Sequence, residues 1–213
     1  MNETQVTFRS GDLTLEGLLS NPGGNVPVAV VCHPHPLYGG SMHNNVVDAI
    51  LAAMWQTGYA TLRFNFRGVG ASDGEHDGGP GEVDDAGAAM AFALAQPGVR
   101  KQGAVMAGYS FGANVAVSAG YAGAEIARIV AVALPLAMAD ARTPDGASKP
   151  VLLVSGDRDS YSPVAGLQAL KSKIGASARL EIISGADHFF GGREAELSRV
   201  IAAARWRLSA RRS

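Results

Sequence analysis

The sequence has little of what several classes of protein require. Its single cysteine, Cys32, excludes an intramolecular disulfide and a cysteine-based zinc site. Charged residues make up only 17% of the chain, the net charge is −1, and no basic stripe of the kind that binds nucleic acid is present. No apolar run is long enough for a transmembrane helix, and the first ten residues lack the basic and apolar segments of a signal peptide. We therefore expect a cytoplasmic protein that neither spans a membrane nor binds nucleic acid.

Glycine, in contrast, is abundant, with 27 of the 213 residues. The glycines have no three-residue period, which excludes collagen, and they lie among many valines, isoleucines and leucines, which argues against a disordered chain. The glycines are therefore expected in the turns of a folded protein. The length suits one domain, 1–213, and the longest irregular stretches, Arg67–Gly81 and Ala137–Lys149, are too short for a lid domain.

Two kinds of hydrophobic pattern alternate along the chain. Gln5–Arg9 and Leu13–Leu19 flank Ser10-Gly11-Asp12, which predicts an antiparallel hairpin. Alternating strands and helices then predict a mostly parallel sheet, and hence a three-layer α/β/α sandwich with the hairpin as an antiparallel edge. The further expected strands are Val26–Cys32, Tyr59–Phe64, Ala104–Ala107, Ile126–Leu134, Val151–Val154 and Arg179–Ile183. The expected helices are Val46–Trp55, Glu82–Ala95, Ala113–Tyr121, Leu167–Ile174 and Glu194–Leu208.

One short motif points to nucleophilic catalysis. Gly108-Tyr109-Ser110-Phe111-Gly112 matches G-x-S-x-G between a predicted strand and a predicted helix, which is the setting of a nucleophile elbow. The turn is so tight that only small residues fit two positions before and after the serine. It would hold Ser110 in a strained backbone conformation and place the Phe111 amide at a helix N-terminus, where it can donate to an oxyanion.

A serine nucleophile requires a histidine base that is oriented by a carboxylate. His188 is the only histidine after Ser110, and it follows the predicted strand that ends at Ile183. Asp157 and Asp159 both follow the strand Val151–Val154. We favour Asp159 as the acid, because Asp157 is nearer the strand end and suits a turn cap or an ion pair with Arg158, although sequence geometry alone leaves both open. Asp187 is a third, weaker candidate, since adjacent side chains in an extended loop diverge.

The second oxyanion donor is expected in the loop after the strand Val26–Cys32, which reads HPHPLYGG. Its prolines have no N–H, so the His35 amide is the best candidate and the Leu37 amide the next. An alternative interpretation makes His33, His35 and His43 metal ligands. Imidazoles two residues apart point away from each other in an extended chain, so we predict no metal site.

The remaining glycine cluster, Gly68 to Gly74, has the spacing G-x-G-x-x-x-G. This spacing is one residue away from a dinucleotide-binding fingerprint, and no helix is expected directly after it, so no nucleotide cofactor is predicted. A partly apolar substrate pocket is expected near the catalytic positions. Its candidate contacts are the large side chains next to the catalytic positions in sequence: Leu37, Tyr38, Tyr109, Tyr161 and Phe189.

Several of these segments together resemble the α/β-hydrolase superfamily along nearly the whole chain. Asn65-Phe66-Arg67-Gly68-Val69-Gly70-Ala71-Ser72 is similar to its D-x-R-G-x-G-x-S loop. Gly108 to Gly112, Gly156 to Asp159 followed by Pro163, and Asp187-His188 match its other marks. In its G-x-x-D pattern the triad acid corresponds to Asp159. The resemblance thus implies the α/β-hydrolase fold and a triad of Ser110, Asp159 and His188.

The run from His33 to Asn45 resembles a small, lidless, dienelactone-hydrolase-like branch of this superfamily. Dienelactone hydrolases proper carry a cysteine at the elbow where Ser110 stands here, which favours general esterase chemistry. The expected function is a serine esterase acting on small or short-chain acyl esters without a cofactor. The alternatives are a thioesterase, peptidase, acyltransferase or cofactor-free haloperoxidase on the same fold, or a non-catalytic binding module. A homodimer is left open.

Overall fold

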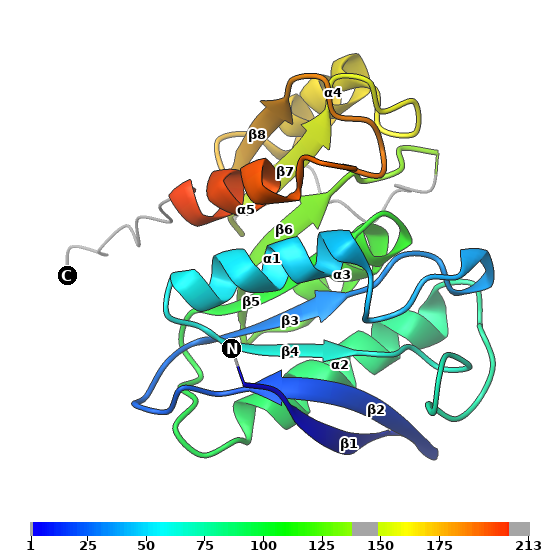
Figure 1. Ribbon diagram of the computed structural model, residues 1–213, viewed down its shortest axis with the longest axis vertical. Helices are drawn as coiled ribbons and strands as arrows, with labels where there is room; N and C mark the ends of the chain where they lie inside the picture. Colours follow the sequence, from blue (N-terminus) through cyan, green and yellow to red (C-terminus); the bar gives the residue numbers. More distant parts are fainter. Residues whose placement is uncertain (1, 138–148, 205–213) are drawn as a thin grey trace.

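The computed structural model describes residues 2–137 and 149–204. Its strands form one eight-stranded sheet in the order β1-β2-β4-β3-β5-β6-β7-β8 (Figure 1). The strands are β1 (Thr4–Ser10), β2 (Leu13–Ser20), β3 (Val28–Cys32), β4 (Ala60–Phe64), β5 (Ala104–Tyr109), β6 (Ile126–Val132), β7 (Val151–Gly156) and β8 (Ala178–Ile183). The helices are the 3₁₀ turn η1 (Pro36–Tyr38), α1 (Asn45–Gln56), α2 (Pro80–Leu94), α3 (Phe111–Ala122), α4 (Val164–Ile174) and α5 (Glu194–Ala203).

The N-terminal hairpin forms one edge of the sheet, as predicted. β1 and β2 are antiparallel, and their tight turn contains Gly11 in the left-handed region at φ 58°. β2 also pairs antiparallel with β4, whereas every other strand pairing is parallel. The predicted, mostly parallel sheet with an antiparallel edge is therefore confirmed.

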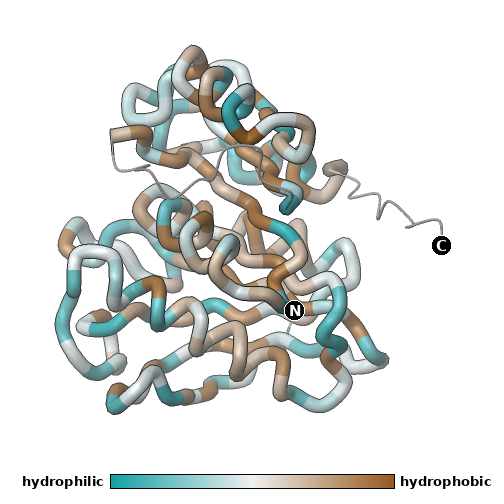
Figure 2. Tube along the Cα trace, turned by 180° about the vertical axis from the view of Figure 1, so that it is seen from behind, coloured by the Kyte–Doolittle hydropathy of each residue, from teal (hydrophilic) through white to brown (hydrophobic). Residues whose placement is uncertain are grey.

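Helices cover both faces of the sheet. α1 and α5 lie side by side on the face turned toward the viewer in Figure 1, and α2, α3 and α4 lie behind the sheet. Residues of β3 alternate between the two layers, because Val31 packs with α1 while Val30 and Cys32 pack with α2 and α3. Cys32 is fully buried in this second cluster and forms no disulfide. The hydropathy colouring of Figure 2 follows this arrangement, with apolar segments in the central strands and polar segments in the outer loops.

Several boundaries differ from the sequence-based prediction. β5 extends to Tyr109 and α3 begins at Phe111, because a single residue, Ser110, makes the whole turn between them. The 3₁₀ turn η1 was not predicted, and β3 begins at Val28 rather than Val26. α5 ends at Ala203, with Ala204 as its C-cap, so Ala204 is not part of the helix, contrary to the prediction. Residues 205–208 of the predicted helix lie outside the described residues, as do residues 138–148. No helix in the described parts of the chain has the length and apolarity to cross a bilayer.

Candidate active site

The turn around Ser110 forces this residue into an unusual conformation. Ser110 has φ 55° and ψ −122°, a region of backbone conformation that residues other than glycine rarely occupy. A Cβ atom on Gly108 would lie 2.0 Å from the carbonyl oxygen of Gly112, and one on Gly112 would lie 2.4 Å from the carbonyl oxygen of Cys32. The first turn of α3 thus packs against both β5 and the end of β3, and the two glycines permit it.

Ser110, His188 and Asp159 form a continuous chain of hydrogen bonds. The Ser110 Oγ lies 3.0 Å from the His188 Nε2, and the His188 Nδ1 lies 2.9 Å from the Asp159 Oδ2. Because an ionised carboxylate only accepts, Nδ1 of a neutral His188 carries the proton, and Nε2 is left as the acceptor for the serine hydroxyl. The arrangement can therefore remove a proton from Ser110.

Asp159 is held in its ionised form although it is only 4% exposed. Burial raises the pKa of this carboxyl, but its hydrogen bond and attraction to His188, together with two backbone amides, outweigh burial and lower the pKa. These amides belong to Tyr161 and Ser162 and donate to Oδ1 at 2.9 and 3.1 Å. Asp159 therefore stays charged and orients the imidazole.

The two other candidate acids face elsewhere. Asp157 accepts hydrogen bonds from the Gly185 amide at 2.7 Å and the Ser184 hydroxyl at 3.2 Å, so it joins the ends of β7 and β8. Asp187 accepts from the Phe189 amide at 3.0 Å. Neither carboxylate bonds the His188 ring, which leaves Asp159 as its partner.

The candidate oxyanion donors are the backbone amides of Phe111 and His35. In the described residues, neither the Phe111 amide nor the His35 amide has a hydrogen-bond acceptor, and the two rings lie with their centroids 4.9 Å apart. The Leu37 amide, the other candidate, donates to the Nδ1 of its neighbour His35 at 3.2 Å. His35 is therefore the better of the two candidates in its loop.

The histidines of this loop have protein partners. His33 is fully buried, with Nδ1 2.6 Å from the Pro34 carbonyl oxygen and Nε2 accepting from the Phe66 amide at 3.1 Å. Both of its ring nitrogens are thus engaged, which leaves none for a metal. Within the described residues, no three His, Cys, Asp or Glu side chains gather as a metal site would require.

Exposed large side chains lie next to His188 and His35. Tyr161 and Phe189 lie on the His188 side, with ring centroids 4.7 and 5.5 Å from that imidazole, and they are 59% and 63% exposed. Tyr38 lies in the loop after β3, with its ring 4.8 Å from that of His35. Leu37 next to it is also exposed. We call Leu37, Tyr38, Tyr161 and Phe189 the apolar rim.

Tyr109, which was predicted with the rim residues as a substrate contact, occupies a different position. It is only 3% exposed, and its hydroxyl donates to the His188 carbonyl oxygen at 3.0 Å. Tyr109 therefore contacts the histidine loop from inside the protein, whereas the other predicted contacts, Leu37, Tyr38, Tyr161 and Phe189, are exposed. The contacts of the Asn45 side chain were not predicted from the sequence. This side chain donates to the Glu194 carboxylate at 2.9 Å and to the Phe189 carbonyl oxygen at 3.4 Å. A long-range contact of this kind leaves no signal in a sequence motif.

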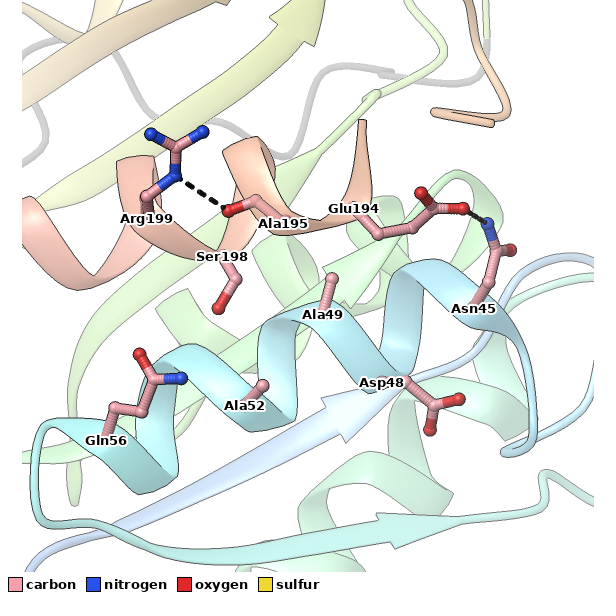
Figure 3. Close-up of a pocket in the computed structure, with 9 residues that line it drawn as sticks. All are labelled: Asn45, Asp48, Ala49, Ala52, Gln56, Glu194, Ala195, Ser198 and Arg199. Atoms are coloured by element: carbon pink, nitrogen blue, oxygen red, sulfur yellow. Dashed lines mark hydrogen bonds between the residues drawn. The ribbon is translucent and has the colours of Figure 1, made fainter. Parts of the chain in front are cut away.

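A groove of about 630 Å³ lies between α1 and α5 (Figure 3). Ala49 and Ala52 of α1 face Ser198 of α5 across it, and the Asn45–Glu194 hydrogen bond closes one end. None of the three hydrogen-bonded residues of the candidate site lines this groove. It is therefore not the candidate active site.

Comparisons with known proteins agree with the observed fold. Residues 30–202 match a family described as an alpha/beta hydrolase domain. An uncharacterized protein of Rickettsia prowazekii is 35% identical over 206 residues, which cover 92% of this chain and 86% of that protein.

Two solved structures are similar over nearly their whole length. One is an alpha-beta serine hydrolase homologue from Coxiella burnetii, with 33% identity, a TM-score of 0.83, and coverage of 95% of this chain and 97% of that one. The other is a serine hydrolase without a lid from Xanthomonas campestris, with 29% identity, a TM-score of 0.81, and coverage of 94% and 92%.

Proposed function

The chain belongs to the α/β-hydrolase family, and from that premise we propose that it is a serine esterase that cleaves small carboxylic esters. The observation that carries the proposal is the hydrogen-bonded chain from Ser110 through His188 to Asp159. The lidless serine hydrolase of Xanthomonas campestris, 29% identical, supports the same chemistry.

The proposed reaction uses the geometry of these three side chains. Ser110 Oγ attacks the ester carbonyl carbon while His188 Nε2 takes its proton, and the Asp159 carboxylate stabilises the resulting imidazolium. The amides of Phe111 and His35 donate to the oxyanion of the tetrahedral intermediate. His188 then protonates the leaving alcohol, which departs and leaves an acyl-enzyme. A water molecule attacks the acyl carbonyl carbon while His188 takes its proton, and His188 returns this proton to Ser110 Oγ as the acid is released.

The apolar rim suggests where the two halves of the ester bind. The leaving alcohol receives its proton from His188, so it would contact Tyr161 and Phe189, the rim residues beside that imidazole. Leu37 and Tyr38 are 71% and 87% exposed, an open surface that provides little contact for a long acyl chain. We therefore propose short acyl esters as substrates. We also propose that the reaction takes place in the cytoplasm, on a single domain without a lid and without a cofactor.

A fluorophosphonate probe tests the proposal, because it labels an activated serine covalently. We expect labelling of the wild type and of Ser172→Ala, a control at an exposed serine of α4, and none of Ser110→Ala. An unlabelled wild type would contradict catalysis by Ser110 and favour a binding module.

A substrate panel tests the bond that is cleaved and the length of the acyl chain. We expect kcat/KM to be highest with p-nitrophenyl acetate or butyrate and to fall toward the palmitate. A steady rise toward palmitate would contradict the short-chain proposal. A clear preference for thioesters or peptides over esters would instead identify a different hydrolase on this fold.

A further inference from the structure

The glycine-rich stretch between β4 and α2, which the catalytic scheme does not use, reaches the candidate active site. It carries His76, whose ring lies 4.9 Å from the His35 ring and 5.5 Å from the Phe111 ring between centroids. His35 and Phe111 are the residues whose amides would bind the oxyanion. His76 thus contacts both proposed donors from a loop distant from each of them in sequence.

A buried carboxylate fixes this histidine. Glu82, in the first turn of α2, is fully buried, and its Oε1 lies 2.8 Å from the His76 Nδ1. The same oxygen accepts from the Asp77 amide at 2.9 Å, and Oε2 accepts from the Gly79 amide at 2.7 Å. A buried charge is tolerated when several donors surround it, and here all three donors come from residues 76–79.

The glycines of this stretch allow the loop to fold around Glu82. Gly78 and Gly79 have φ of 74° and 127°, values that side chains disfavour. At Gly81 a Cβ atom would lie 2.1 Å from the Arg67 guanidinium. A capping glutamate at this helix position requires only the Gly79 contact. The additional bonds to the His76 ring and the Asp77 amide therefore distinguish Glu82 from an ordinary cap, and His76 is the one side chain among its donors.

The His35 ring transmits the contact to the oxyanion loop. His35 Nδ1 accepts from the Leu37 amide and so closes the 3₁₀ turn η1, which makes the ring an integral part of that turn. A displaced His35 ring would move the backbone that carries the His35 amide. Small displacements of a catalytic donor lower the rate strongly, because the donor acts on the transition state.

We propose that His76 and Glu82 are a positioning pair for the oxyanion site: Glu82 orients the His76 ring, and the ring holds His35 and Phe111 in place. This inference rests on the proposed serine esterase function. A contribution confined to the oxyanion lowers kcat and leaves KM unchanged, because the substrate carbonyl in the ground state carries little of the charge.

Two substitutions at position 76 separate the ring from its hydrogen bond. In His76→Asn the amide can still donate to Glu82, but no ring contacts His35 and Phe111. In His76→Phe the ring remains, and Glu82 loses one of its three donors. His43→Asn, at an exposed histidine outside the candidate site, is the matched control.

The measurements are kcat and KM for p-nitrophenyl acetate, the rate of fluorophosphonate labelling, and Tm. For His76→Asn we expect kcat and the labelling rate to be about 10- to 100-fold lower, with KM within twofold. His76→Phe should retain more of kcat yet have the lower Tm, because it leaves a buried carboxylate short of a donor. His43→Asn should match the wild type in each measurement.

We expect His76→Asn to have the lower kcat of the two variants and His76→Phe to have the lower Tm. A purely structural role of His76 would not produce these opposite orders. Losses of kcat that follow the losses of Tm, or a His76→Asn enzyme as active as His43→Asn, would overturn the inference while the esterase function stands. A wild type that is neither active nor labelled would overturn both. If neither variant folds, Glu82→Gln decides: unchanged kcat contradicts the inference, and a fivefold or greater loss at constant KM supports it.

Discussion

The hydroxyl of Tyr109 donates a hydrogen bond of 3.0 Å to the carbonyl oxygen of His188. Tyr109 directly precedes Ser110, so the strand that presents the proposed nucleophile also holds the backbone of its base. Burial, and next the negative charges of Asp159 and Asp187, raise the pKa of the Tyr109 phenol. It therefore remains a donor throughout the neutral pH range.

Tyr109→Phe should loosen this connection. The His188 carbonyl would lose its buried donor, for which we expect a loss of about 1 kcal/mol in the free energy of unfolding. We also expect kcat for p-nitrophenyl acetate to fall about 5- to 10-fold with little change in KM, since a shift of His188 by less than 1 Å affects proton transfer. Urea unfolding and steady-state kinetics measure the two effects. A variant equal to the wild type in both would show that the contact is dispensable.

The two aspartates after β7 should differ sharply in their effects. Asp159→Asn removes the charge that orients His188 and should lower kcat by roughly 10³- to 10⁴-fold. Asp157→Asn alters only the contacts with Ser184 and Gly185, so kcat should stay within twofold and the free energy of unfolding should fall by about 1 kcal/mol. Equal losses of kcat in the two variants would argue against Asp159 as the single acid.

His33 should make the protein sensitive to mild acid. Burial lowers the pKa of His33 from 6.5 to about 4, outweighing the Pro34 hydrogen bond and the charge of Glu82, which both raise it. Between these pH values the unfolded chain binds a proton that the folded protein does not. Stability is therefore retained above pH 6.5 and lost as the pH falls toward 4, by up to about 3 kcal/mol.

His33→Gln tests this pH dependence, because glutamine offers a donor and an acceptor without a titrating group. We expect the free energy of unfolding, measured by urea at intervals between pH 4 and 6.5, to depend less steeply on pH in this variant than in the wild type. Parallel pH profiles would mean that another group causes the acid sensitivity.

Two glycine-to-alanine substitutions should change the free energy of unfolding in opposite directions. A Cβ on Gly108 would lie 2.0 Å from the backbone oxygen of Gly112, so Gly108→Ala should destabilise the fold by about 3 kcal/mol or more and abolish activity. Gly87, within α2, has no atom within 4 Å of its added Cβ, and Gly87→Ala should stabilise by about 0.5–1 kcal/mol. Their Tm values should thus lie on either side of that of the wild type.

The sequence predicted those parts of the site that depend on local patterns. The elbow followed from a tight G-x-S-x-G between a strand and a helix. The choice of Asp159 followed from the position of Asp157 nearer the strand end and was supported by the resemblance to the G-x-x-D pattern. The buried position of Tyr109 was missed, because the predicted strand ended at Ala107, whereas β5 continues to Tyr109 and packs it in the same cluster as Val105 and Ala107. The contact of His76 with His35 was missed for another reason, since it joins two loops whose juxtaposition depends on β3 and β4 being neighbours.

Cys32 has a practical consequence for every variant named above. It is the only thiol in the chain and lies fully buried at the end of the central strand β3. Burial, and then the charge of Asp85, raise its pKa, so the folded protein presents no reactive thiolate. Under native conditions a thiol reagent can modify only molecules in which this strand has opened. The rate at which a thiol reagent modifies Cys32 therefore reports the opening of β3, in the wild type and in each variant.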